Sequence, residues 1–562
     1  MTEQNEITSN TEAQNALGRI GRLFIPIALI MGIISILPRL FGANLDPIAA
    51  SMPPDTLFYM EINGLNLLSQ DSLRIAESFQ EIMDEADFDF DSEDPNLALE
   101  EIEQQFFEDT GLSIQEDILS WVGPNFGVAL MGLEQEFVDF GEVPDIILGV
   151  SVLNQNEADA FIPKMIELVG EESEVTESEY QGVRIYTAVD NFGDAVSFAR
   201  TAEVMVITPQ EALIQAVVEA QNGESLASTD LYKDTIAQLP EERIMTFFMA
   251  GAGYDNFLSI MEADPTLPGF QADALAQLLF DSIGMSISTN AHGIQIDTKT
   301  IYSDMSEAQR AYLEANTGEM ASAKLLPEST MMLISGQRLD LYWAFMQENF
   351  DAMGLPAGDI DEAMNLFEAE FGFNPIEDLI PILDGEYAIA LTESNEGQIS
   401  ASMGVNMGAM LLLETSESNA MRSLVEDIND TIFGLIMIQP QLISHPDAAV
   451  YEISNPFLGG QIAAYGVSDS HFILSTSDGE ISQLLSDKSS LADSAVFQET
   501  WAAFPETNKP VLYMNVGEMF GMLTGLDPDL DNAARLNPVS IVAAGNQFEN
   551  DVVGSTVIIF IP

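Results

Sequence analysis

The sequence predicts an α+β fold with two tandem homologous domains, each an antiparallel sheet with helices packed on one face, preceded by one N-terminal transmembrane helix. One apolar segment near the N-terminus has the character of a membrane span. Several sequence blocks occur twice in the same order. Within each copy, short runs alternate apolar and polar residues, as expected for antiparallel strands with one solvated face. With 562 residues, 47% of them hydrophobic, the chain is long enough for more than one packed core.

The first element is a polar tail, residues 1–18, followed by a predicted signal anchor at residues 19–41. Two arginines precede an apolar run from Leu23 to Leu37. A spanning helix needs about 20 residues, so the run is short unless Arg39 reaches the interface by snorkelling.

The charge pattern of this segment predicts its orientation. Positive residues before the run place the N-terminus in the cytoplasm and the bulk of the chain in the periplasm or outside the cell. We therefore expect a single-pass protein of the cell membrane. A signal peptide cleaved at Ala49 or Ala50 is the alternative, because small residues there resemble a cleavage site.

Four pairs of sequence blocks follow, at offsets of about 258 to 274 residues. Their matching order predicts a tandem duplication with domains at residues 50–324 and 325–562, a period far too long for a solenoid repeat. The pairs are "MPPDT" from Met52 and "LPEST" from Leu326, "GLSIQEDILSWVGPNFGVAL" from Gly111 and "GFNPIEDLIPILDGEYAIAL" from Gly372, "LASTDLYKDTIAQLP" from Leu226 and "LADSAVFQETWAAFP" from Leu491, and "SIGMSISTNAHGIQIDTKTI" from Ser282 and "SIVAAGNQFENDVVGSTVII" from Ser540.

Each block suggests a local structure. The first block opens a strand, with Pro53 fixing the chain entry and Thr56 beginning the strand. The second block predicts a short helix with acidic residues in its first turn, then a glycine turn and an alternating strand. Its acidic pair, Glu116-Asp117 in one copy and Glu377-Asp378 in the other, is best explained as helix-terminal charge. The fourth block predicts two strands around a polar turn.

These motifs carry a resemblance to a known family. The anchor, the "P-x-D-T" strand opener and the pattern "G-x-x-x-x-E-D-I-L-x-W-x-G" before a strand resemble the bacterial proteins of unknown function catalogued as DUF3352. The resemblance implies a membrane-anchored, exported protein without an assigned activity, and it implies no catalytic residues. The chain is unusually acidic for this pattern.

The charge of the chain bounds its partners. The formal net charge is -74, from 17 basic and 91 acidic residues, so the surface repels nucleic acid and anionic lipid headgroups. Such a surface suits a salty environment, in which screening relieves the self-repulsion. The chain has no cysteine, which excludes disulfides, zinc-thiolate sites, iron–sulfur clusters and cysteine nucleophiles.

The sequence contains no strong catalytic pattern. The three histidines, His292, His445 and His471, include no i, i+4 pair for zinc. There is no G-x-S-x-G elbow, and no glycine precedes a lysine as a Walker A loop requires. We expect no catalytic residue, no cofactor and no enzyme activity.

The densest acidic stretch, "DEADFDFDSEDPN" from Asp84, is a weak calcium candidate through Asp87, Asp89 and Asp91. An EF-hand loop counted from Asp87 would need glycine and glutamate at its sixth and twelfth positions, where Ser92 and Ala98 stand, so that motif is excluded. A solvated loop is the simpler interpretation.

One difference between the two copies is informative about function. The first carries "GEESEVTESEY" from Gly170, and the second carries "TIFGLIMIQPQLISHP" from Thr431, which is longer and apolar. An added apolar loop predicts a contact with a partner, the bilayer or the other half. A filled crevice between the halves is the alternative. The contact candidates are Ile432, Phe433, Leu435, Ile436, Met437 and Ile438.

The leading functional hypothesis is a non-catalytic binding or structural module of the cell envelope, anchored in the membrane, with an envelope protein or a hydrophobic ligand as its partner. One alternative is a carrier of a lipid or other hydrophobic ligand, which needs a continuous apolar cavity between sheet and helices. The other is a carboxylate-dependent envelope hydrolase, which needs two close, partly buried carboxylates in a cleft.

Overall fold

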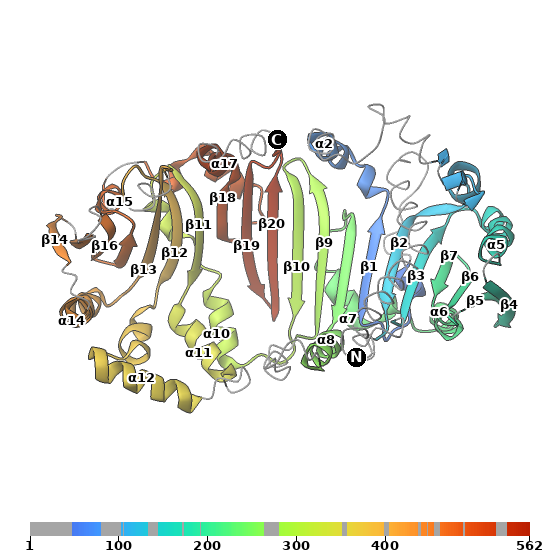
Figure 1. Ribbon diagram of the computed structural model, residues 1–562, viewed down its shortest axis with the longest axis horizontal. Coiled ribbons are helices and arrows are strands. Elements are labelled where there is room, and N and C mark those ends of the chain that lie inside the picture. Colours follow the sequence, from blue (N-terminus) through green and yellow to red (C-terminus); the bar gives the residue numbers. More distant parts are fainter. Residues whose placement is uncertain are drawn as a thin grey trace, which may run out of the picture. The chain divides into compact units, whose positions relative to one another are not determined.

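The computed structural model describes most of the chain and has an α+β fold with extensive antiparallel sheet (Figure 1). It divides into two compact units. Unit 1 comprises Met1–Glu77, Met83–Ala272 and Phe280–Thr289, and unit 2 comprises Ser78–Ile82, Asp273–Leu279 and Asn290–Pro562. The described residues are 48–79, 103–104, 106–108, 110–132, 144–170, 173–191, 193–263, 280–350, 357–397, 404–435, 440–446, 448–454, 461–486, 489–523 and 537–562.

The sheet of unit 1, coloured blue to green in Figure 1, has the strand order β9-β8-β1-β2-β3-β7-β6-β5-β4, and its pairings are antiparallel. Its strands are β1 (Phe58–Asn63), β2 (Val122–Leu130), β3 (Ile146–Val152), β4 (Ser173–Tyr180), β5 (Val183–Asp190), β6 (Ala195–Arg200), β7 (Val204–Thr208), β8 (Met245–Ala250) and β9 (Ser282–Asn290).

The sheet of unit 2 has the order β10-β20-β19-β18-β11-β12-β13-β17-β16-β15-β14, also antiparallel. From β19 to β14 this order repeats that of unit 1 from β9 to β4, strand for strand. The strands are β10 (Gly293–Ile301), β11 (Thr330–Gln337), β12 (Glu386–Glu393), β13 (Met407–Glu414), β14 (Gln441–Ser444), β15 (Ala449–Ser454), β16 (Gln461–Val467), β17 (His471–Ser475), β18 (Lys509–Asn515), β19 (Ile541–Glu549) and β20 (Val552–Phe560).

Helices and single helical turns connect these strands. In unit 1 they are η1 (Ala49–Ser51), η2 (Asn66–Leu68), α2 (Gln70–Ser78), η3 (Ile114–Ile118), α5 (Gln155–Gly170), α6 (Glu211–Asn222), η5 (Leu226–Ser228), α7 (Asp230–Ile236) and α8 (Gly251–Ala263). In unit 2 they are α10 (Glu307–Ala315), η6 (Ala321–Lys324), α11 (Leu339–Asn349), α12 (Ala357–Phe371), η7 (Pro375–Leu379), η8 (Ile380–Ile382), α14 (Ser418–Leu435), α15 (Asp478–Leu484), η9 (Leu491–Asp493), α16 (Ala495–Ala502) and α17 (Val516–Leu523).

One face of each sheet is covered by helices along most of its width. In unit 1, Ile214 and Val217 of α6 and Tyr232 of α7 pack on this face. In unit 2, Ile481 of α15 and Phe497 of α16 do the same. The strands meet these helices with every second residue, which is the periodicity of a pleated strand.

The expectation that helices pack on one face is wrong, because both faces carry them. In unit 1, α5 packs Ala158 and Phe161 against Leu148 and Val150 of β3. Those two residues point away from Ile147, which lies in the core on the other face. The central run of β3 is buried at consecutive positions, and a strand buried on both sides needs cover on both sides. In unit 2, α14 covers the same part of the second face.

The strand openers form the same contacts in both units. The Thr56 hydroxyl donates to the Pro53 carbonyl at 2.7 Å, and the Thr330 hydroxyl donates to the Pro327 carbonyl at 2.7 Å. Both threonines are buried. In each unit the chain before this turn also accepts a backbone hydrogen bond from the first residue of a helical turn: Leu226 donates to Met52, and Leu491 to Leu326.

Residues 290–324, which the sequence assigned to the first domain, group with unit 2. They include β10, which pairs with β20 along its whole length. The predicted tail and anchor, residues 1–18 and 19–41, lie outside the described residues. Among the residues that the structure describes, no helix combines the length and apolar character needed to cross a membrane.

Candidate functional site

The second face of the unit 2 sheet carries a continuous row of aliphatic side chains. Because side chains opposite each other on antiparallel strands share a face, the register places one residue from each of five adjacent strands side by side. We call this set the apolar row. It consists of Leu512 of β18, Ile334 of β11, Ile389 of β12, Leu411 of β13 and Leu474 of β17.

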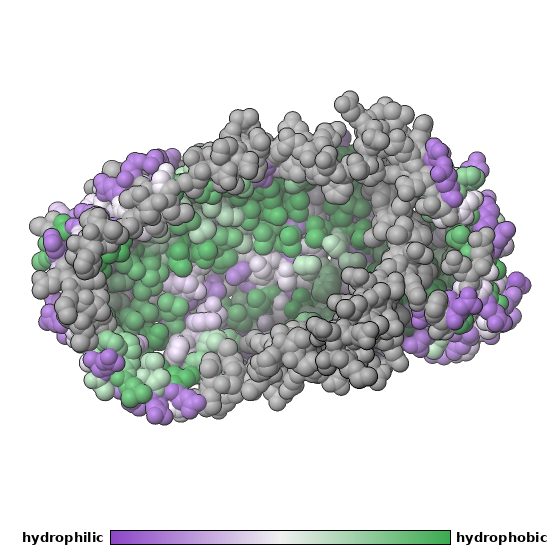
Figure 2. All heavy atoms as spheres, in the orientation of Figure 1, coloured by the Kyte–Doolittle hydropathy of each residue, from purple (hydrophilic) through white to green (hydrophobic). Residues whose placement is uncertain are grey.

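Three of the five side chains of the apolar row are exposed to solvent. Ile334 is 41% exposed, Ile389 46% and Leu474 36%, although they lie on interior strands of the sheet. Figure 2 shows hydrophobic residues gathered over β11, β12 and β13. Scattered exposed aliphatic residues are ordinary, whereas a contiguous apolar patch marks a binding surface.

A second set of apolar side chains runs parallel to the row, two residues further along the same strands. Met332 of β11 lies opposite Met514 of β18 and Leu391 of β12, and all three are half-buried. The open face therefore extends along the strands as well as across them. Five strands at the usual spacing span about 19 Å.

Unit 1 has an equivalent row, formed by Phe247, Met60, Val128 and Leu148 on β8, β1, β2 and β3. Met60 and Val128 are half-buried, and Leu148 is 5% exposed beneath α5. The two units thus present the same apolar surface, and unit 2 leaves more of it uncovered.

The two ends of the open face in unit 2 differ in chemistry. At one end of β12, Tyr387 lies near Tyr312 of α10, whose ring centroid is 5.2 Å from that of Tyr342 of α11. Burial raises the pKa of Tyr387 above its ordinary value. At the opposite strand end stand two exposed carboxylates, Glu393 of β12 and Glu518 of α17. Glu518 is only partly desolvated, and this partial desolvation, together with the charge of Glu393, raises its pKa.

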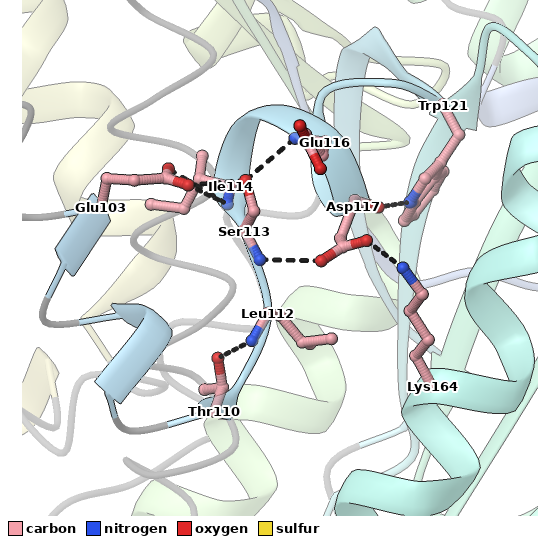
Figure 3. A network of polar contacts seen from close by, with 9 residues as sticks. All are labelled: Glu103, Thr110, Leu112, Ser113, Ile114, Glu116, Asp117, Trp121 and Lys164. Atoms are coloured by element: carbon pink, nitrogen blue, oxygen red, sulfur yellow. Dashed lines mark hydrogen bonds and ion pairs between the residues drawn. The ribbon is translucent and has the colours of Figure 1, made fainter.

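The repeated acidic pair lies in two helical turns, η3 and η7. In unit 1 the Ser113 hydroxyl accepts from the backbone N–H of Glu116, and the carboxylate of Asp117 accepts from the backbone N–H of Ser113 at 2.8 Å (Figure 3). Asp117 also forms an ion pair with Lys164 of α5. In unit 2, Asp378 accepts from the backbone N–H of Asn374 at 2.7 Å. These hydrogen bonds join the two ends of each helical turn and stabilise it.

Hydrogen bonds explain the pKa of Asp117. Partial burial alone would raise it, but the hydrogen bonds from Lys164 and Ser113, with the charge of Lys164, hold it below its usual value. Figure 3 also shows Glu103 reaching the same turn, where its carboxylate accepts from Ser113 Oγ at 2.6 Å and from the Ile114 N–H at 3.0 Å. These hydrogen bonds and the ion pair with Lys164 hold η3 in place next to α5.

The histidines are dispersed. His471 begins β17, its Nδ1 lies 2.8 Å from Ser470 Oγ, and burial lowers its pKa against the opposing influence of Glu414. His292 lies in the turn after β9 and packs edge-on against Phe560. His445 follows β14. In the described part of the chain, no three His, Asp or Glu side chains are grouped to hold a metal ion.

The calcium candidates Asp87, Asp89 and Asp91 lie outside the described residues, as do Ile436, Met437 and Ile438 of the partner-contact set. The rest of that set, Ile432, Phe433 and Leu435, belongs by backbone to the last turns of α14. The predicted apolar loop is therefore partly helix. It is followed by strand β14, and in unit 1 the corresponding acidic segment forms strand β4.

The fold and the site together define an α+β protein with antiparallel sheets and an open apolar sheet face. The family model described as "Protein of unknown function (DUF3352)" matches residues 94–534. The chain belongs to this family. No curated protein matches it.

Among solved structures, the chain is similar to crystal forms I and III of TP0453, with 8% sequence identity, a TM-score of 0.23, and coverage of 47% of this chain and 82% of that chain. For crystal form IV the identity is 7%, the TM-score 0.24, and the coverage 46% and 81%. A likeness with so low a TM-score supports no conclusion about this protein's function.

Proposed function

We propose that this protein is a membrane-anchored, extracytoplasmic carrier that binds the alkyl chain of a lipid-like ligand on its open sheet face and catalyses no reaction. The observation that carries the proposal is the exposed apolar row of unit 2. Covering each methylene of such a ligand is worth about 0.8 kcal/mol, so a long chain lying across several strands gains substantial affinity.

The chemistry of the row favours an alkyl chain over a polar substrate. Its members are aliphatic and offer no hydrogen-bond donor or acceptor by which a polar group would be oriented. Methionines such as Met332 and Met514 border it, and their flexible thioether side chains adapt to ligands of irregular shape. The surface is therefore suited to a chain that is recognised by its hydrophobicity.

The predicted anchor at residues 19–41 supports an envelope location, because it would hold the module beside a membrane from which such ligands come. The net charge of -74 opposes docking of the face itself on an anionic bilayer. A ligand withdrawn from the bilayer is therefore a better occupant than the bilayer surface.

We also infer that the two units arose by tandem duplication. The support is their common strand order and the repeated contacts of Thr56 with Pro53 and of Thr330 with Pro327. A duplicated scaffold explains why the same apolar face occurs in both units.

The alternative of a carboxylate-dependent hydrolase would rely on Glu393 and Glu518, the pair at the end of the open face. Both are solvent-exposed, whereas a general acid requires a shielded environment to hold its proton near neutral pH. Their exposure favours a binding role.

The direct test is photolabelling of the full-length chain in phosphatidylcholine vesicles with an alkyl diazirine probe, followed by mapping of the labelled peptides by mass spectrometry. We expect label on β11, β12 and β13. Ile389→Asp places a charge in the middle of the apolar row and should reduce this labelling about tenfold or more, because a buried unpaired carboxylate is costly.

Val496→Asp is the matched control. Val496 is 43% exposed on α16, which packs on the other face of the same sheet, so the variant makes the same kind of change away from the site. Labelling should be unchanged. Wild-type protein that takes no label on these strands, or labelling that Ile389→Asp leaves intact, would overturn the proposed function.

A further inference from the structure

The open face of unit 2 ends at a pair of carboxylates that come from distant parts of the chain. Met332 of β11 lies opposite both Leu391 and Met514. Glu393 comes two residues after Leu391 and so points to the same face of the sheet. Glu518 comes four residues after Met514, in the first turn of α17, whose position is fixed by a hydrogen bond from the Glu518 N–H to Asn515 Oδ1 at 3.1 Å.

Unit 1 lacks both carboxylates at the same places. Phe58 of β1 lies opposite Leu130 and Met249, as Met332 lies opposite its two partners. Two residues after Leu130 stands Gly132, and four residues after Met249 stands Gly253. The apolar face is thus common to the two units, and its acidic end is specific to unit 2.

The space at Gly253 explains part of this difference. A Cβ placed there would lie 2.9 Å from the Leu57 carbonyl oxygen and 3.2 Å from the Phe58 ring. A side chain such as glutamate would force the backbone of β1 to move. Unit 2 has room for the carboxylate that unit 1 excludes.

Two carboxylates at the end of an apolar surface favour a cationic group there. Their negative charges repel each other, and a cation placed beside them relieves that repulsion. The strong negative charge of the whole chain acts in the same direction and disfavours an anionic headgroup. Charge and apolar surface therefore select one class of amphiphile.

We propose that unit 2 binds a long-chain amine, with its alkyl chain on the apolar row and its ammonium group at Glu393 and Glu518. This inference rests on the proposed function and adds the ligand class to it. An ammonium group donates three hydrogen bonds, enough for both carboxylates at once. Unit 1 has glycines at both positions and offers no carboxylate to an ammonium group there.

The test is competition against the diazirine probe by dodecylamine, dodecanol and dodecanoate. It is run in about 0.5 M salt, where the Debye length of about 4 Å screens the general attraction of amines to the acidic surface. We expect dodecylamine to compete about tenfold better than dodecanol, because charge-assisted hydrogen bonds are roughly twice as strong as neutral ones. Dodecanoate should be the weakest competitor.

The double variant Glu393→Gln/Glu518→Gln removes both charges and should bring dodecylamine to the level of dodecanol. The matched control Glu499→Gln/Glu506→Gln makes the same charge change at exposed positions on and just after α16, and should preserve the preference for the amine.

The outcomes separate the two proposals. If all three competitors act equally on the wild type, or if the double variant keeps the preference for the amine, the ligand class is wrong and the alkyl-binding function stands. Competition by calcium chloride but not by dodecylamine would assign the carboxylates to a metal ion and overturn the inference. If no alkyl compound competes, the proposed function itself fails.

Discussion

Units 1 and 2 share the strand order from β9 to β4 and from β19 to β14, and they differ in how much of the second face of the sheet is covered by helices. In unit 1 that face is largely covered, and Phe126 and Leu148 are buried against α5 and η3. Among the described residues of unit 2, α14 packs against Leu413 and Phe472 on this face, whereas Ile334 and Ile389 are exposed. The same apolar pattern thus serves a hydrophobic core in one unit and a surface in the other.

This difference in cover indicates which face of the sheet serves binding and which serves folding. The face that packs against α6 and α7, or against α15 and α16, is alike in both units and forms a hydrophobic core in each. Selection for folding alone gives no reason to keep isoleucines exposed on interior strands, because aliphatic exposure favours association. The exposed row and its acidic end are therefore the places where function is expected to constrain the sequence.

The largest expected effect is the difference in stability between truncating a covered side chain in unit 1 and an exposed one in unit 2. Phe126→Ala, at a side chain that is 4% exposed, should lower the free energy of unfolding by about 3–5 kcal/mol. Ile389→Ala should change it by about 0.5 kcal/mol or less, since that side chain is already exposed. Denaturant unfolding of both variants measures the difference. Equal destabilisation would mean that Ile389 is packed in solution and that the face is closed.

The next effect separates the two helical turns that carry the acidic pair. Asp117→Asn removes the ion pair with Lys164 and weakens the hydrogen bond to Ser113, and should cost about 2 kcal/mol. Because the pKa of Asp117 is lowered in the folded state, its stabilisation is present above the usual carboxyl pKa and is lost as the pH falls through the folded value.

Asp378→Asn is the corresponding change in unit 2, where the carboxylate accepts from the Asn374 N–H. It should cost less, about 1 kcal/mol, because Asp117 additionally has its lysine partner. Unfolding curves at neutral pH and at pH 3 distinguish the two variants. A difference between Asp117→Asn and wild type that persists unchanged at low pH would contradict the assigned role of the charge.

Sequence reasoning reached the α+β class, the family and the repeated strand opener because these depend on local patterns. Pro53 and Thr56 are three residues apart, and the hydrogen bond between them follows from that spacing. The second helical layer was missed, although the three consecutive apolar residues Ile146, Ile147 and Leu148 are a signal of a strand covered on both faces.

The candidate site could not be predicted from the sequence for a different reason. Ile334 and Ile389 become neighbours only through the register of β11 and β12, and exposure depends on which helices cover them. Glu393 and Glu518 lie far apart in the chain and meet at one sheet end because Leu391 and Met514 both pair with one residue of β11. Aligning the two copies at the ends of these strands would have shown glycine against glutamate.

A smaller effect tests the hydrogen bond between threonine and proline that opens a strand in both units. Thr56→Val and Thr330→Val each remove a hydroxyl that donates to a proline carbonyl at 2.7 Å, with little change in volume. Each should lower the free energy of unfolding by about 1 kcal/mol, the usual net value of one hydrogen bond. Local hydrogen exchange of β1 and β11 reports the two sites separately. Markedly unequal losses would show that the two openers are not equivalent.

The smallest effect concerns the acidic end that distinguishes the units. The pKa of Glu518 is raised in the folded state, so the folded protein holds this proton more tightly than the unfolded chain does. The free energy of unfolding therefore falls as the pH rises from the usual carboxyl pKa through the raised value. Glu518→Gln abolishes this fall and should stabilise the protein by about 0.5 kcal/mol or less at pH 7, as an exposed pair of charges allows.

The same variant should show no gain at pH 3, where Glu518 is protonated in the wild type, and a reduced gain in high salt, which screens the repulsion from Glu393. Glu506→Gln provides the control at an exposed carboxylate away from the face. Thermal unfolding at the two pH values measures both. A stabilisation by Glu518→Gln that is independent of pH would exclude repulsion from Glu393 as its cause, and would remove the reason for a cation at this end of the sheet.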